Sequence, residues 1–221
     1  MPRTPVYIVC SPRPGVGKTL LARLVTEFLL LSRGSVLAFD ISLRDPSLVD
    51  YLPRLTETAD IDDTFGKMAL MDRLIVNDGL PKVVDLGFHA FDEFFRMCEE
   101  IGFVKEGDRR GIEPIILFLS DHHRASTQSW RGLRTAFPTT AMVPIDNEHV
   151  LQGELPPGFA PPHMLRIAAL PPFLRTYIDR LTFSFTDYLR RSERSSELHQ
   201  WTRRNYTSLR EMEANLRRYR A

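Results

Sequence analysis

The sequence predicts an α/β fold: a mostly parallel, twisted sheet with helices on both faces and an extended C-terminal helical segment. Short apolar runs alternate with longer amphipathic runs, the pattern of strands and crossover helices in a parallel sheet. The first apolar run, Val6–Cys10, passes through a glycine-containing turn directly into a helical stretch. The 221 residues, 43% of them hydrophobic and 26% charged, suit a globular protein with a sizeable core.

Strands are expected where a short apolar run is bounded by turn residues, and helices where apolar residues recur every three or four positions. The expected strands are Val6–Cys10, Val36–Phe39, Val83–Leu86, Ile115–Leu119, Ala141–Pro144 and Leu165–Leu170. The expected helices are Thr19–Ser32, Thr64–Asn77, Ala90–Ile101 and Ala125–Phe137. Two segments, Glu106–Glu113 and the proline-rich Gln152–Pro162, are expected to be surface loops.

The chain is expected to divide into an α/β domain, residues 1–170, which carries the loop described next, and a helical segment, residues 171–221, packed on or extending from it. Pro171-Pro172 suits a helix start, and an apolar stripe at helical spacing follows from Phe173 to Phe185. A second helix is expected over Glu197–Arg218. Residues 190–221 hold nine arginines and four acidic residues. Four interpretations stay open: contact with DNA phosphates, binding to an anionic membrane, packing on its own domain or a protein partner, and a solvated face.

The most informative motif is Pro-Gly-Val-Gly-Lys-Thr at residues 14–19, directly after the first expected strand. A loop of this kind between a strand and a helix cradles phosphates with its backbone N–H groups. Lys18 can reach the β- and γ-phosphates of a nucleoside triphosphate, and the Thr19 hydroxyl can hold Mg²⁺. The usual phosphate-binding motif, G-x-x-x-x-G-K-[ST], has glycine at the position that Pro12 occupies here. The alternative is therefore a plain glycine-rich turn with an exposed lysine. The expected nucleotide-binding residues are Pro14, Gly15, Val16, Gly17, Lys18, Thr19 and Leu20.

Three aspartates stand at or just after the ends of expected strands, where a parallel sheet binds its ligands. Asp40 ends the second strand, Asp85 lies near the end of the third, and Asp121 follows the fourth. A triphosphate site needs carboxylates to hold Mg²⁺ and to orient water. Asp85 is expected to meet Mg²⁺ through water, and Asp40 to lie close to Mg²⁺ and the γ-phosphate. The alternative for each is a turn or capping aspartate.

These segments resemble the ParA/MinD family of P-loop ATPases. The resemblance is carried by Arg13–Thr19, Val36–Leu48 and Val83–Gly87, in the family's order. It implies an ATPase that binds Mg-ATP between two protomers, hydrolyses it slowly and positions or partitions DNA or a protein cargo. The implied partners are a second copy of the chain and a protein that stimulates hydrolysis. DNA could bind the arginine-rich segment, and a membrane partner is not expected.

The resemblance also implies roles for single residues. Lys18 would bind phosphate during catalysis, and Asp40 would assist Mg²⁺ organisation and hydrolysis. Arg13 occupies the position of a lysine that reaches across the family's dimer, and Pro14 replaces a loop glycine. Asn147 follows the fifth expected strand, where relatives place an adenine-reading asparagine, and a turn asparagine is the alternative. No guanine-binding Asn-Lys-x-Asp motif is present, which favours adenine.

Two other functions stay open: a non-hydrolysing nucleotide-dependent adaptor that acts through its C-terminal helix, and a small-molecule ATP-dependent kinase or ligase on the same scaffold. The two cysteines, Cys10 and Cys98, are expected to be buried free thiols in a reducing compartment. No run approaches the roughly 18 apolar residues of a membrane span, and the first strand leaves no room for a signal peptide. A cytoplasmic protein is therefore expected.

Overall fold

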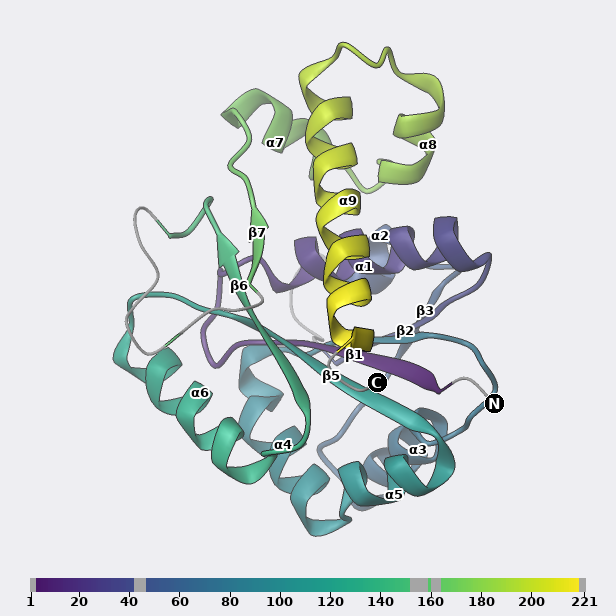
Figure 1. Cartoon of the computed structure of the whole chain (residues 1–221), viewed down its shortest axis with the longest axis vertical. Coiled ribbons are helices and arrows are strands. Elements are labelled where there is room, and N and C mark those ends of the chain that lie inside the picture. Colours follow the sequence, from purple (N-terminus) through teal and green to yellow (C-terminus); the bar gives the residue numbers. More distant parts are fainter. Residues whose placement is uncertain (1–2, 42–46, 152–158, 160–163, 219–221) are drawn as a thin grey trace.

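The computed structural model describes residues 3–41, 47–151, 159 and 164–218. Within these residues seven strands form one sheet in the order β3-β2-β4-β1-β5-β6-β7, and every neighbouring pair is parallel (Figure 1). The strands are β1 Thr4–Cys10, β2 Leu37–Asp40, β3 Thr56–Thr58, β4 Lys82–Asp85, β5 Ile112–Leu119, β6 Ala141–Asn147 and β7 Leu165–Ile167. The predicted α/β class with a parallel sheet is confirmed, and the short β3 is an additional strand.

Helices cover both faces of this sheet (Figure 1). On one face lie α1 Lys18–Arg33, α2 Leu48–Tyr51, α7 Pro172–Ile178, α8 Phe185–Arg191 and α9 Glu197–Arg218. On the other lie α3 Thr64–Leu74, the short 3₁₀ helix η1 Phe88–Ala90, α4 Phe91–Glu100, α5 Phe103–Arg110 and α6 Arg124–Ala136. Each face encloses its own apolar core, with the sheet between the two: the α1 core on the face covered by α1, and the α4 core on the face covered by α4.

The sequence of the central strand β1 is apolar except for Thr4, and the burial of the strand explains why. All seven of its residues are buried, because helices cover both faces of a parallel sheet. Successive side chains of a strand point to opposite faces, so Tyr7 and Val9 enter the α1 core while Val6 and Ile8 enter the α4 core. β1 lies between β4 and β5, which places the loop after Cys10 in the middle of the carboxyl edge of the sheet.

The expectation of a surface loop over Glu106–Glu113 was wrong. Residues 103–110 form α5, and β5 begins directly after it at Ile112. The charged side chains suggested a loop, but tertiary packing favours a helix: Phe103 is 1% exposed, and Gly107 is buried facing Ile112. Arg109 and Arg110 both pair with Glu106 on the exposed side, and Gly111 ends the helix at a φ of +75°. The other expected loop, Gln152–Pro162, lies outside the described residues except for Phe159.

The C-terminal segment contains a break where a continuous apolar stripe was predicted. α7 ends at Ile178, and α8 starts at Phe185 after Ser184, whose hydroxyl accepts the Asp187 N–H and caps the helix. α9 follows the predicted bounds, and its apolar side chains join the α1 core. Its apolar face therefore packs on its own domain, while Arg203, Arg204 and Arg210 stay exposed. Among the described residues, no helix is both long and apolar enough to cross a membrane.

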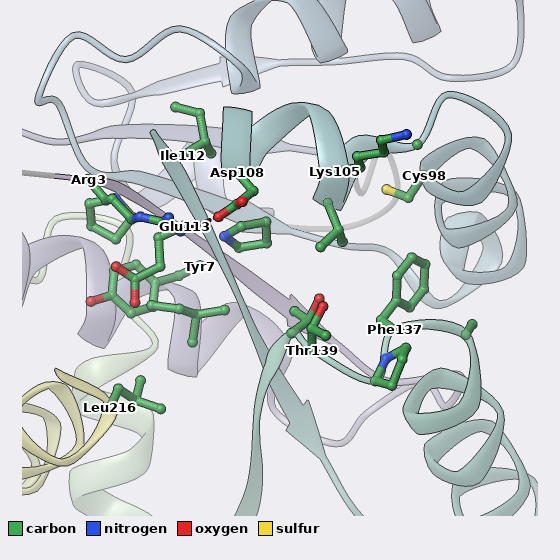
Figure 2. A pocket seen from close by; sticks show the side chains of 18 of the residues that line it. Arg3, Tyr7, Cys98, Lys105, Asp108, Ile112, Glu113, Phe137, Thr139 and Leu216 are labelled. Atoms are coloured by element: carbon green, nitrogen blue, oxygen red, sulfur yellow. Dashed lines mark ion pairs between the residues drawn. The ribbon is translucent and has the colours of Figure 1, made fainter. Parts of the chain in front are cut away.

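A cavity of about 1330 Å³ lies at the amino edge of the sheet, opposite the loop after β1. Figure 2 shows Arg3, Tyr7 and Glu113 on one side of it and Lys105 and Phe137 on the other. At its inner wall the Tyr7 hydroxyl donates to Glu213 Oε1 at 2.5 Å, and Arg33 pairs with the same oxygen at 2.6 Å. These bonds join β1, α1 and α9, so polar contacts link the three elements at this end of the molecule.

Candidate functional site

The loop between β1 and α1 has the backbone shape that its glycines suggested. Gly15 and Gly17 have φ angles of +71° and +92°, a region that other residues enter at a steric cost. Gly17 also lacks space for a side chain, because a Cβ there would lie 2.3 Å from the Asn147 amide nitrogen. Both Pro14 and Gly15 are exposed, whereas Val16 is buried. The strand, loop and helix thus leave an exposed turn directly before the N-terminus of α1.

Lys18, the first residue of α1, folds back over this loop. Its Nζ donates to the carbonyl oxygen of Arg13 at 2.6 Å and lies 5.9 Å from the centre of the Phe88 ring. Burial lowers the pKa of Lys18, and the nearby Asp85 acts against that shift. The ammonium group is therefore held at the loop by a carbonyl oxygen that an anionic ligand could replace as its partner.

Thr19 and Asp85 meet at the start of α1. The Thr19 hydroxyl donates to Asp85 Oδ2 at 2.8 Å, although 66 positions separate the two residues in the chain. The second oxygen of Asp85 is buried and has no hydrogen-bond partner among the described residues. An unpartnered buried carboxylate oxygen is costly, so this position suits a ligand that supplies positive charge or a donor.

Burial raises the pKa of Asp85 to about 7. The hydrogen bond from Thr19 acts in the opposite direction, the Asp40 carboxylate adds to the rise, and the Lys18 ammonium opposes it. Asp40 is the register partner of Asp85 on the neighbouring strand β2, and its side chain is 1% exposed. Its Oδ2 accepts the backbone N–H of Val49 at 3.0 Å, which fastens the start of α2 to this edge.

The donor set of Thr19, Asp40 and Asp85 fits a hard cation such as Mg²⁺, which prefers hydroxyl, carboxylate and water oxygens. The unpartnered oxygen of Asp85 is the structural observation that supports this fit. Within the described part of the chain, no group of three or more His, Cys, Asp or Glu side chains is arranged to hold a metal. Any Mg²⁺ here would therefore keep several of its waters or take oxygens from a bound phosphate.

Arg13 and Asp121 lie together rather than at the Thr19–Asp85 pair. Arg13 Nε is 3.4 Å from Asp121 Oδ2, and the Arg13 side chain is 38% exposed. The other oxygen of Asp121 accepts from Ser126 Oγ at 2.5 Å and from the His123 N–H at 2.9 Å. Asp121 thus organises the turn before α6, which is the capping alternative considered for it, and it also orients Arg13.

Asn147 ends β6 beneath the loop. Its side chain is 2% exposed, and its Nδ2 donates to the carbonyl oxygen of Val16 at 2.9 Å. Sequence reasoning missed this contact and those of Val49 and Phe88 with the site, because backbone N–H and carbonyl groups and ring faces leave no motif. Leu20, expected near a nucleotide, is half-buried and packs against the α1 core. The reading of adenine by Asn147 stays a prediction.

Neither a family model nor a curated protein matches this sequence. The structure itself defines an α/β protein with a parallel sheet, whose central strand leads at its carboxyl end into the Gly15–Thr19 loop.

The raised pKa of Asp85 predicts how the stability of the metal-free protein depends on pH. Between the ordinary value of 3.8 and about 7, the unfolded chain has lost the Asp85 proton while the folded protein keeps it. The folded state binds more protons there, so the free energy of unfolding should fall as pH rises, by up to about 4 kcal/mol from this group. Above pH 7 this contribution should become constant.

Urea unfolding in EDTA, over about pH 5 to pH 8, measures this dependence in the wild type and in Asp85→Asn. The variant carries no titrating group at this position, so its curve should be flatter, and the difference between the two proteins isolates Asp85 from other groups. Parallel curves would contradict the raised pKa.

Proposed function

We propose that this chain is a nucleotide-binding switch of the P-loop type, which binds Mg-ATP at the Gly15–Thr19 loop and hydrolyses it slowly. The observation that supports the proposal is the hydrogen bond from Thr19 to Asp85, whose second carboxylate oxygen has no partner among the described residues. This pair lies directly after the glycine loop, over which the Lys18 side chain folds back. Loop N–H groups and Lys18 would bind phosphate oxygens, and Thr19, Asp85 and Asp40 would hold Mg²⁺. Bound Mg²⁺ would neutralise charge that develops on the phosphates.

The switch would act through the hydrogen bond between Asp40 at the end of β2 and Val49 in α2. Asp40 belongs to the candidate metal-binding edge and also holds the Val49 N–H at the start of α2. A ligand that draws the Asp40 carboxylate away would release that bond, so α2 would report nucleotide binding to its neighbours. A second copy of the chain, meeting the first at the exposed loop and Arg13, and a DNA or protein cargo are the partners that this switch would serve.

A non-hydrolysing adaptor is the second candidate, and Arg13 and Pro14 favour it. Arg13 is already paired with Asp121, so reaching a partner's phosphates would require breaking that contact. Pro14 has no N–H to donate to a phosphate. In this alternative the protein would bind ATP and expose a surface for a protein partner without turnover, so ATP hydrolysis measured in the purified protein separates the two functions.

Titration with a fluorescent ATP analogue tests the proposal directly. We expect Mg²⁺-dependent binding to the wild type that ATP displaces better than GTP, and weaker binding in EDTA. Phosphate release at saturating ATP then measures turnover, which should fall in Asp40→Asn if the chain is an ATPase. Binding without turnover would support the adaptor, and no binding with or without Mg²⁺ would refute both.

A further inference from the structure

The side-chain amide of Asn147 is bonded at both of its ends. Nδ2 donates to the Val16 carbonyl at 2.9 Å, and Oδ1 accepts the N–H of His149 at 3.2 Å. The main-chain carbonyl of Asn147 accepts from Val150 and Leu151 at 2.9 and 2.8 Å, which closes a tight turn after β6. The amide is thus fixed from β6 before it reaches the loop, and it cannot rotate without losing one of these bonds.

The hydrogen bond from Asn147 to the Val16 carbonyl sets the direction of one peptide group in the loop. The peptide between Val16 and Gly17 is trans, so its carbonyl and its N–H point in opposite directions. Because the Val16 carbonyl points at Asn147, the Gly17 N–H is presented on the far side of the loop. The absence of a Cβ at Gly17 lets the amide come this close, since a Cβ would lie 2.3 Å from Nδ2.

We propose that Asn147 is a positioning residue, which holds the phosphate loop in its anion-binding shape before any nucleotide arrives. The inference rests on the proposed function and deepens it. A loop fixed in advance does not lose conformational freedom when it binds phosphate, so affinity rises for any ligand that carries phosphates. Asn147 then contributes equally to ATP, to GTP and to inorganic tripolyphosphate, and base selectivity comes from elsewhere in the site.

The first test compares those three ligands, each with Mg²⁺, on the wild type and on Asn147→Ala. Loss of one buried hydrogen bond and of the loop order that it maintains should weaken all three by a similar factor, about fivefold to tenfold. The ratio of ATP to GTP affinity should not change. Asn205→Ala is the matched control, because Asn205 is also buried and donates to a backbone carbonyl, that of Trp201 at 2.9 Å, but on α9.

The second test needs no ligand and keeps the turn after β6 intact. Asn147→Asp retains Oδ1 for His149 and removes the donor to Val16. Hydrogen exchange of the amides in residues 15–20 of the nucleotide-free protein should become faster in both Asn147 variants and stay unchanged in Asn205→Ala.

A loss of ATP affinity with unchanged tripolyphosphate affinity would overturn the inference, because that is the result expected of a base-reading residue. Unchanged loop exchange would overturn it as well. If the wild type binds none of the three ligands, the proposed function fails, and the exchange measurement still decides whether Asn147 holds the loop.

Discussion

Lys18→Ala is expected to weaken ATP binding at least about 100-fold, because charge-assisted hydrogen bonds to phosphate are the strongest polar contacts that this loop can offer. The ammonium group is already at the loop, 2.6 Å from the Arg13 carbonyl, so it needs little movement to meet a phosphate. Burial has also removed part of its hydration, as its lowered pKa indicates, which strengthens its attraction to an anion. Titration with the fluorescent ATP analogue measures the change.

Lys105→Ala provides the matched control, since Lys105 lines the cavity at the opposite edge of the sheet. Its ATP affinity should equal that of the wild type. Unfolding curves of both variants show whether a change in affinity reflects lost folding. Equal affinities for Lys18→Ala and the wild type, with both proteins folded, would place nucleotide binding away from the Gly15–Thr19 loop.

Glu27→Ala is expected to reduce the free energy of unfolding by about 3–5 kcal/mol, the usual cost of removing one member of a buried charged cluster. The Glu27 carboxylate accepts from Ser184 Oγ at 2.5 Å and from the N–H groups of Phe185 and Thr186 at 3.2 and 2.9 Å. It therefore joins α1 to the start of α8. Its loss would leave those donors unpaired and would deprive the buried Arg23 guanidinium of the largest of the nearby charges that favour its ionised form.

Urea unfolding followed by tryptophan fluorescence checks this expectation. The ring centres of Trp201 and Phe185 are 6.0 Å apart. In a Trp130→Phe background, Trp201 is the one remaining tryptophan, so the emission reports on the α8–α9 region. Glu27→Gln keeps an acceptor oxygen and should lose less than Glu27→Ala. Glu211→Ala, at an exposed position of α9, should change stability by less than about 0.5 kcal/mol. A Glu27→Ala effect as small as that of Glu211→Ala would show that the carboxylate does not hold α8.

The helical break between α7 and α8 illustrates the limit of periodicity. The apolar spacing from Phe173 to Phe185 suits one helix, and nothing local forbids it. In the folded chain, Phe183 joins the core and its carbonyl accepts from Arg23 at 3.3 Å, while Glu27 holds the backbone N–H of Phe185. These contacts come from α1, and their energy exceeds the small helical preference of the intervening residues.

The sequence by itself determined the parallel α/β class, the strand-loop-helix around Gly15–Thr19 and the bounds of α9. Each depends on a local property: the period of apolar residues, or a backbone shape that only glycine adopts at low cost. It also placed Asp40 and Asp85 at the same edge, since the carboxyl ends of parallel strands lie together.

Only the tertiary structure decided which side chains touch. Thr19 meets Asp85 across 66 positions, Arg13 meets Asp121 across 108, and Asn147 reaches Val16 across 131. A hydrogen bond requires its atoms to approach within about 3 Å, and burial then decides the protonation of the groups involved. The number of residues between two positions predicts neither the distance between their atoms nor their burial, because both are set by how the helices pack on the sheet.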